Sequence, residues 1–287
     1  MADMFSQEFI FNALKVSVVM GLLLSYLGVH VVGRGIVFVD LALGQISMLG
    51  VAFANYIEKD PTVVSIIFTL VGAFVLSFVN VKDKRLKQEA IIGIVYAVAS
   101  AATVLLISKA PHGEADISEV LFGSLFTVTA TQIMIMAGVF SLIGVGHAVF
   151  RKKFFELTEM FENHQVEHIG IFNLWNFLFY LSIGLAIVLA VRTGGVIPVF
   201  SYIVVPPVCA VLLTRKKSSL VATAMAVSLA GSFFGIYFST RYDFPAGSSV
   251  VAMLGAIFAA AAMVRLLNLG KKRMMKANGE PKESQQP

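Results

Sequence analysis

Long apolar segments recur along the whole chain, and each is long enough to cross the hydrocarbon core of a membrane. They run for roughly 18 to 23 residues and are separated by short polar stretches. A bilayer core of about 30 Å needs about 20 apolar residues in a helix. Only 14% of the residues are charged and the mean hydropathy is +0.84, which excludes an ordinary soluble domain. The sequence therefore predicts an all-α, polytopic membrane protein.

Nine transmembrane spans are expected, and eight remain possible. The expected spans cover residues 9–31, 36–57, 61–80, 90–108, 130–150, 171–191, 196–213, 219–239 and 248–267. The apolar stretch 120–128 is too short to cross. Residues 1–270 are expected to form one transmembrane domain, and the basic residues 271–287 a disordered tail. The polar stretches leave no room for a soluble domain, so any energy source is expected on another protein.

The positions of Lys and Arg predict the orientation in the membrane. With the N-terminus outside, seventeen of the 22 basic residues fall in the inner segments and only four in the outer ones. Inverting the chain, or removing one helix, would spread the basic clusters over both faces. The first eight residues carry two acids and no base, unlike the start of a cleaved signal peptide. We therefore expect a retained first helix, an outer N-terminus and a cytoplasmic C-terminus.

The second span holds the clearest group of polar residues within an apolar segment. It carries Asp40, Gln45 and Ser47. At 100° per residue, Asp40 and Ser47 share one helical face, while Gln45 lies on another. The functional interpretation is the polar lining of a substrate path, because ionisable residues in spans usually mark such paths. The alternative is an interfacial Asp that is solvated or hydrogen-bonded, beside small residues that allow close helix packing.

The seventh span contains Pro198, Pro206 and Pro207. Proline lacks the backbone N–H of a helical residue and kinks or breaks a helix. Irregular backbone at membrane depth survives only where protein or a water-filled cavity satisfies the freed carbonyls. The sequence therefore predicts a broken, pore-lining helix, with a packing kink as the alternative. Ser201 and Tyr202 lie between the prolines, where their hydroxyls could face a path.

The longest inner loop, 151–170, is typical of an amphipathic surface helix, because Phe and Leu side chains alternate with Glu. It either lies on the membrane surface or docks a cytoplasmic partner. His164, Glu167 and His168 match the H-x-x-E-H pattern of inverted zinc metallopeptidases, but no third ligand lies nearby. That enzyme stays a remote alternative. Three isolated histidines are expected at the interface or surface, namely His30, His112 and His147.

Five segments together resemble the permease subunits of ATP-binding-cassette importers for zinc, manganese and iron. They occur in the family's order and are spread over almost the whole chain. They are residues 45–53 (QISMLGVAF), 86–96 (LKQEAIIGIVY), 121–129 (LFGSLFTVT), the seventh span with Pro206 at the family's proline, and 238–247 (FSTRYDFPAG).

The resemblance implies a homodimer of permeases in a prokaryotic cytoplasmic (inner) membrane, working by alternating access. It also implies an ATPase subunit docked on a coupling helix at about 151–170, and an extracytoplasmic protein that delivers the cargo. ATP and Mg would belong to the ATPase, because this chain has no phosphate-binding loop. The chain itself is expected to be no enzyme, to bind no cofactor and to bind no nucleic acid. The implied docking residues are Phe161, Glu162, His164, His168 and Gly170.

The chain departs from the family at one pair of residues in the second span. The family's Asp and His, four residues apart, fall on Leu41 and Gln45. Leu41 cannot bind a metal, and Gln45 offers only a neutral oxygen, whereas zinc favours imidazole and carboxylate. Asp40 is adjacent but lies off that face. Asp40 and Gln45 are nevertheless the expected metal contacts.

The expected cargo is a divalent metal ion or a metal complex. The expected substrate path consists of Asp40, Gln45, Ser47, Ser201, Tyr202 and Pro206. Two other transport classes stay open, an ion-coupled secondary carrier and an ATP-binding-cassette permease for a non-metal cargo.

Overall fold

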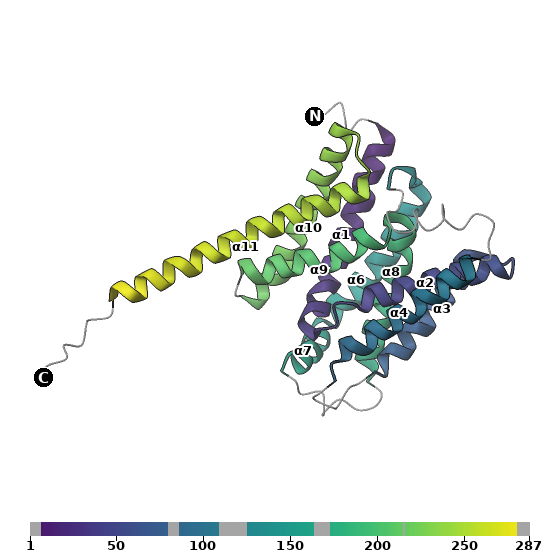
Figure 1. The fold of residues 1–287 in the computed structure, drawn as a ribbon, viewed down its shortest axis with the longest axis horizontal. Helices are drawn as coiled ribbons and strands as arrows, with labels where there is room; N and C mark the ends of the chain where they lie inside the picture. The colour runs from purple at the N-terminus through teal and green to yellow at the C-terminus, as the bar shows by residue number, and fades with distance from the viewer. Residues whose placement is uncertain (1–6, 80–85, 109–124, 164–172, 215, 280–287) are drawn as a thin grey trace, which may run out of the picture.

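A computed structural model describes residues 7–79, 86–108, 125–163, 173–214 and 216–279, which form a helical bundle (Figure 1). In these ranges the chain folds into ten α-helices and one 3-10 turn, without a strand. The elements are α1 (Glu8–Arg34), α2 (Val39–Tyr56), α3 (Pro61–Ser77), α4 (Gln88–Ile107), η1 (Leu125–Thr127), α6 (Ala130–Val149), α7 (Arg151–Glu162), α8 (Leu174–Gly194), α9 (Val196–Leu213), α10 (Lys217–Tyr242) and α11 (Ala246–Gly279).

Nine of these helices coincide with the nine expected spans, and the predicted all-α fold is confirmed. Seven of them are long and apolar enough to cross a membrane, whereas α3 is a shorter apolar helix and α2 is not among the seven. The tenth helix, α7, lies within the predicted amphipathic segment. Between α4 and α6, Leu125–Thr127 forms a single 3-10 turn, and residues 120–124 lie outside the described ranges. The predicted division into a domain and a tail stays a prediction, although the backbone of α11 is helical to Gly279.

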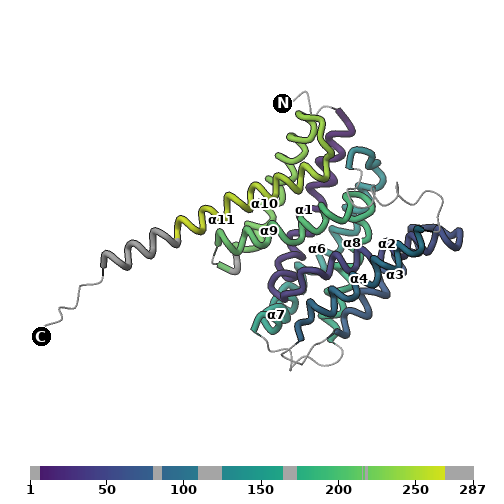
Figure 2. Tube along the Cα trace, viewed as in Figure 1, coloured from purple at the N-terminus to yellow at the C-terminus, as the bar shows by residue number. Residues whose placement is uncertain are grey.

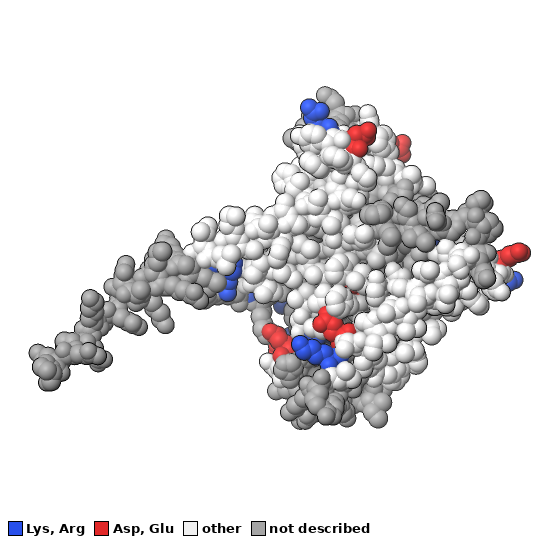
Figure 3. All heavy atoms as spheres, in the orientation of Figure 1, with Lys and Arg blue, Asp and Glu red and all other residues white. Residues whose placement is uncertain are grey.

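Helix α1 lies at the centre of the bundle, where it packs against α9 and α10 (Figure 1). Helices α2, α3, α4 and α8 form a second group beside it, and α11 packs against α9 and α10. Most of α1 is buried, whereas few residues of α4, α6 and α11 are, and α11 extends beyond its neighbours (Figure 2). The visible face is largely free of charged side chains, which show mainly at its periphery (Figure 3). In a membrane, lipid or another subunit covers such apolar surfaces.

Local signals in the sequence set several helix boundaries. Asp60 caps α3 by accepting hydrogen bonds from the backbone N–H groups two and three residues ahead, and Pro61 occupies the first helical position. Asn173 caps α8 in the same way. Gly35 ends α1 with a φ of 67°, a left-handed conformation that glycine adopts without strain.

Helix α9 continues through Pro206 and Pro207, so the expected break is not present. Pro207 cannot donate to the carbonyl of Ile203, four residues earlier. That carbonyl lies against Gly28 of α1, where an added Cβ would collide with it. The prediction of a broken helix is therefore wrong. Close packing by the backbone of α1 covers the carbonyl and lets the helix continue.

Replacing Gly28 with Ala tests this contact. We expect Gly28→Ala to destabilise the protein by about 1–3 kcal/mol, because the new methyl group forces α1 and α9 apart. The measurement is the apparent melting temperature in detergent. The control is Gly93→Ala in α4, where an added Cβ meets nothing within 4 Å. Equal melting temperatures for the two variants would contradict the close contact.

Candidate functional site

Asp40 is the one acidic residue that is buried in the described part of the chain. Its side chain is 3% exposed and lies in the first turn of α2. The backbone N–H groups of Asp40 and Leu41 lie beside the carboxylate, but neither of its oxygens has a hydrogen-bond partner. An ionised carboxylate is costly in a low-dielectric interior unless something compensates its charge. Asp40 can therefore contact a cation without giving up another partner.

The structure separates Asp40 from Gln45. Helix α2 is regular, so the angular offset between the two residues remains. Gly44, one turn after Asp40, is nearest to Val191 of α8 and Val196 of α9, whose methyl groups lie 3.9 Å from a Cβ built on it. The face of Asp40 thus turns towards the junction of α8 and α9, and buried Ser47 shares it. Gln45 lies on the half-buried face of the helix.

The expected path residues of α9 are buried, and their hydroxyls are bonded within the bundle. Ser201 donates to the carbonyl of Ile197 in its own helix at 2.9 Å. The hydroxyl of Tyr202 lies 2.6 Å from that of Ser232 in α10. Pro206 is also buried. One of these hydroxyls bonds within α9 and the other bonds to α10. A role for these residues in a path stays a prediction.

A second polar group, which we call the α7 junction, consists of His30, Arg34, Thr158 and Asn176. Arg34, at the end of α1, is only 6% exposed. Its Nε donates to Thr158 Oγ1 of α7 at 3.2 Å, and its Nη1 donates to Asn176 Oδ1 of α8 at 3.0 Å. The guanidinium carbon lies 3.7 Å from the centre of the Phe179 ring, a favourable cation–π distance.

The other members extend the α7 junction to two more helix ends. His30 Nδ1 lies 2.8 Å from Thr158 Oγ1, so both α1 residues meet the same hydroxyl. Asn176 Nδ2 donates to the carbonyl of Ser77 at the end of α3, at 2.9 Å. The junction therefore fixes α7 to α1, and the same chain of hydrogen bonds joins α1 to α8 and α8 to α3. It also gathers helix ends that the sequence assigned to one side of the membrane.

Sequence reasoning missed this junction. From the sequence, Arg34 is one of the seventeen basic residues of the inner segments and carries no other signal of its own. His30 and His147 are 0% and 2% exposed, so the expectation that they lie at the surface is wrong, and His112 lies outside the described residues. Their ring centroids are 6.2 Å apart, within the bundle. The available signal was the spacing of His30 and Arg34, which places both on one face at the end of the first span.

Helix α7 presents one face to the bundle and the other outward. Its buried residues are Phe154, Leu157, Thr158 and Phe161. Phe161 is 7% exposed and its ring centre lies 5.4 Å from the Arg34 guanidinium carbon, so this predicted docking residue points inward. Glu162 is exposed. The remaining predicted docking residues, and the pattern His164, Glu167 and His168, lie outside the described residues.

A groove of about 290 Å³ runs between α7 and the ends of α1, α9 and α10. Glu159 and Glu162 lie on its α7 side, and Val211 and Leu220 lie opposite. Within the described ranges, no three His, Cys, Asp or Glu side chains come together as a metal site.

Comparison with known proteins supplies the family. A profile of the ABC 3 transport family matches residues 6–265. The chain is 28% identical to the manganese transport system membrane protein MntC of Listeria monocytogenes, over 88% of this chain and 89% of that protein. It is 25% identical to the high-affinity zinc uptake system membrane protein ZnuB of Haemophilus influenzae, over 88% of this chain and 95% of that protein.

A solved structure shares the fold. PsaBC from Streptococcus pneumoniae, in complex with Fab, aligns with a TM-score of 0.75 and 22% identity. The alignment covers 91% of this chain and 94% of the other.

Removing the Arg34 side chain should loosen α7. We expect Arg34→Ala to raise deuterium uptake in residues 151–162, because α7 loses a hydrogen bond and a cation–π contact. The measurement is hydrogen exchange of the full chain in detergent. The control is Lys153→Ala, which removes only an exposed ion pair with Glu156. Unchanged exchange in Arg34→Ala would show that α7 is held by its apolar face alone.

Proposed function

Because this chain belongs to the ABC 3 transport family, we propose that it is the permease subunit of an importer for a divalent metal ion (zinc, manganese or iron) or a metal complex. The two relatives above are named for manganese transport and for zinc uptake. The observation that supports a cationic cargo in this chain is Asp40, whose buried carboxylate has no hydrogen-bond partner.

The path we propose passes Asp40 at the start of α2, with Ser47 on the same face and Gln45 on the neighbouring one. A carboxylate and neutral oxygens bind a cation more weakly than a set of carboxylates and imidazoles. Weak binding suits passage, because a transported ion must leave as well as enter. In a two-fold dimer the second copy would contribute its own Asp40 to the path. Ser201, Tyr202 and Pro206 of α9 would support the wall behind it.

Energy would come from ATP, with Mg, on a cytoplasmic ATPase subunit that docks on α7. The α7 junction supports this part of the proposal, because a displacement of α7 must be passed to α1, α8 and α3 through Arg34, Thr158 and Asn176. Glu162 faces outward at the end of α7, where a basic partner surface could reach it. An extracytoplasmic binding protein would deliver the cargo. The orientation is an outer N-terminus and a cytoplasmic C-terminus in an inner membrane.

A non-metal cargo is the second candidate. It is favoured by one observation, the replacement of the family's Asp and His by Leu41 and Gln45. A transporter of this kind would keep the dimer, the ATPase and α7 and would lack metal uptake.

Tracer uptake tests the cargo. Cells that express the chain with its ATPase and binding protein are given labelled zinc, manganese, iron or chelated iron. We expect saturable uptake of one of them, reduced at least tenfold by Asp40→Asn and more weakly by Gln45→Ala, because each loses an oxygen contact with the cation. The control is Asp60→Asn, which removes an exposed carboxylate but keeps a residue that caps α3 well.

Two results would count against this cargo. Full uptake by Asp40→Asn would remove Asp40 from the path. No uptake of any tracer by an assembled complex would favour the non-metal cargo.

Charge reversal on α7 tests the docking surface. We expect Glu162→Lys to reduce co-purification of the ATPase. The exposed carboxylate would attract a basic surface of the partner, whereas the positive charge of Lys would repel it. Glu156→Lys is the control, since Glu156 is exposed on a different face of the same helix. Equal retention of the ATPase by both variants would place the contact elsewhere.

A further inference from the structure

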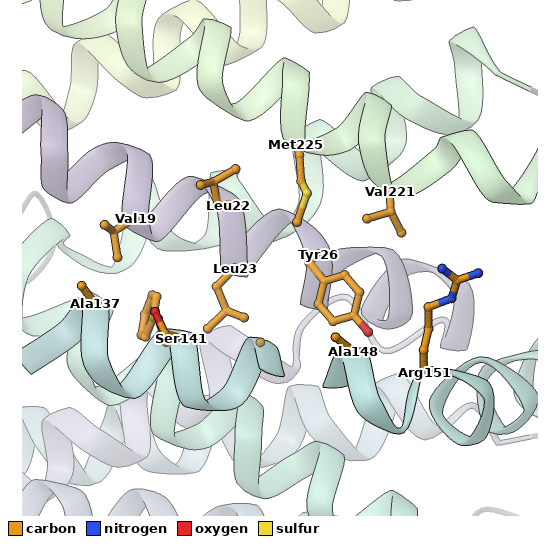
Figure 4. Close-up of a pocket in the computed structure, with 12 residues that line it drawn as sticks. Val19, Leu22, Leu23, Tyr26, Ala137, Ser141, Ala148, Arg151, Val221 and Met225 are labelled. Carbon is orange, nitrogen blue, oxygen red and sulfur yellow. The ribbon is translucent and has the colours of Figure 1, made fainter. Parts of the chain in front are cut away.

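A cavity of about 380 Å³ lies between α1, α6 and α10 (Figure 4). Its walls are almost entirely apolar and include Leu22 and Leu23 of α1, Phe140 of α6 and Met225 of α10. The volume is within the range of about 300–1,000 Å³ that small-molecule sites occupy. Because all three helices are long and apolar enough to span a membrane, the medium around this cavity is lipid rather than water.

One end of the cavity is polar and positively charged. Figure 4 shows the hydroxyl of Tyr26 pointing towards Ala148 and the Arg151 end. That hydroxyl is buried and has no hydrogen-bond partner. Arg151 lines the cavity, its side chain is exposed, and Lys152 and Lys153 follow it.

We propose that this cavity binds a membrane phospholipid with an anionic headgroup. An acyl chain occupies the apolar part, and the headgroup phosphate lies at Arg151 with the Tyr26 hydroxyl as a donor. Basic pockets between membrane helices select anionic headgroups in this way. This site goes beyond the proposed transport function and does not depend on the cargo.

Charge favours lipid over a second copy of the chain as the occupant. A symmetric contact across this face would bring the same basic end of each copy together, Arg151 to Lys153 on both sides. Like charges at an interface oppose association. An anionic lipid neutralises the same cluster.

Filling the cavity tests the acyl-chain part. Gly144 lines the cavity, and a Cβ built on it meets nothing within 4 Å. The Leu side chain of Gly144→Leu would therefore occupy part of the cavity. The matched control is Gly138→Leu on the same helix, where a Cβ is equally free but the residue does not line the cavity. The full-length protein is washed extensively in detergent, and phospholipid per chain is counted by mass spectrometry. We expect retention by the wild type and Gly138→Leu and at least a fivefold loss in Gly144→Leu.

The headgroup part is tested by adding dioleoyl phosphatidylglycerol or dioleoyl phosphatidylcholine to the delipidated protein. Phosphatidylglycerol should raise the melting temperature more than phosphatidylcholine does. Arg151→Gln should weaken the apparent phosphatidylglycerol affinity about fivefold, the factor expected for one basic residue near an anionic surface, and Lys152→Gln less.

Four results would overturn the proposal. The first is no lipid retained by the wild type, and the second is equal retention by both glycine variants. The third is a disulfide between two copies carrying Ser141→Cys in a Cys209→Ser background, because a second copy would then cover the cavity. Equal responses to the two lipids, unaffected by Arg151→Gln, would refute selection of an anionic headgroup.

Discussion

The interior of a bilayer offers no hydrogen-bond partner, so each polar group placed there must find its partner within the protein. In the helices, most backbone N–H and C=O groups form hydrogen bonds with one another. Many Ser and Thr side chains of the spans bond to carbonyls of their own helix, as Thr69 does with Ser65 and Ser182 with Leu178. In α9, the carbonyl that Pro207 leaves without its usual donor is packed closely against Gly28 of α1.

Two buried charged residues meet this constraint in different ways. Arg34 is held by neutral oxygens and aromatic rings, and its contacts fasten α7 to the bundle. Neither carboxylate oxygen of Asp40 has a hydrogen-bond partner. The contacts of Arg34 Nε and Nη1 hold one arrangement of helices, although Nη2 has no partner, whereas the carboxylate of Asp40 keeps both oxygens for a ligand. The contrast is the physical basis for giving Arg34 a positioning role and Asp40 a place in the path.

The groove and the cavity beside α7 also differ in chemistry. The one between α7, α9 and α10 has Glu159 and Glu162 on its α7 side, which suits a basic protein surface. The other, between α1, α6 and α10, is apolar with Arg151 at one end, which suits an anionic lipid. Helix α7 borders both. A lipid bound at Arg151 would therefore contact the same helix on which we propose that the ATPase docks.

The sequence by itself determined the helices, because apolar length and caps are local properties, whereas the prolines of α9 predicted a break that the packed helix does not have. Helices at all nine expected spans, the cap at Asp60 and the helical start of the 151–170 segment could be predicted in this way. Tertiary structure decided what the polar residues do. The contact of Arg34 with Thr158 joins residues 124 positions apart, and Tyr202 bonds to Ser232 rather than facing an open path. The direction and partner of a side chain depend on which helices pack together, and packing brings together segments whose pairing no local pattern encodes.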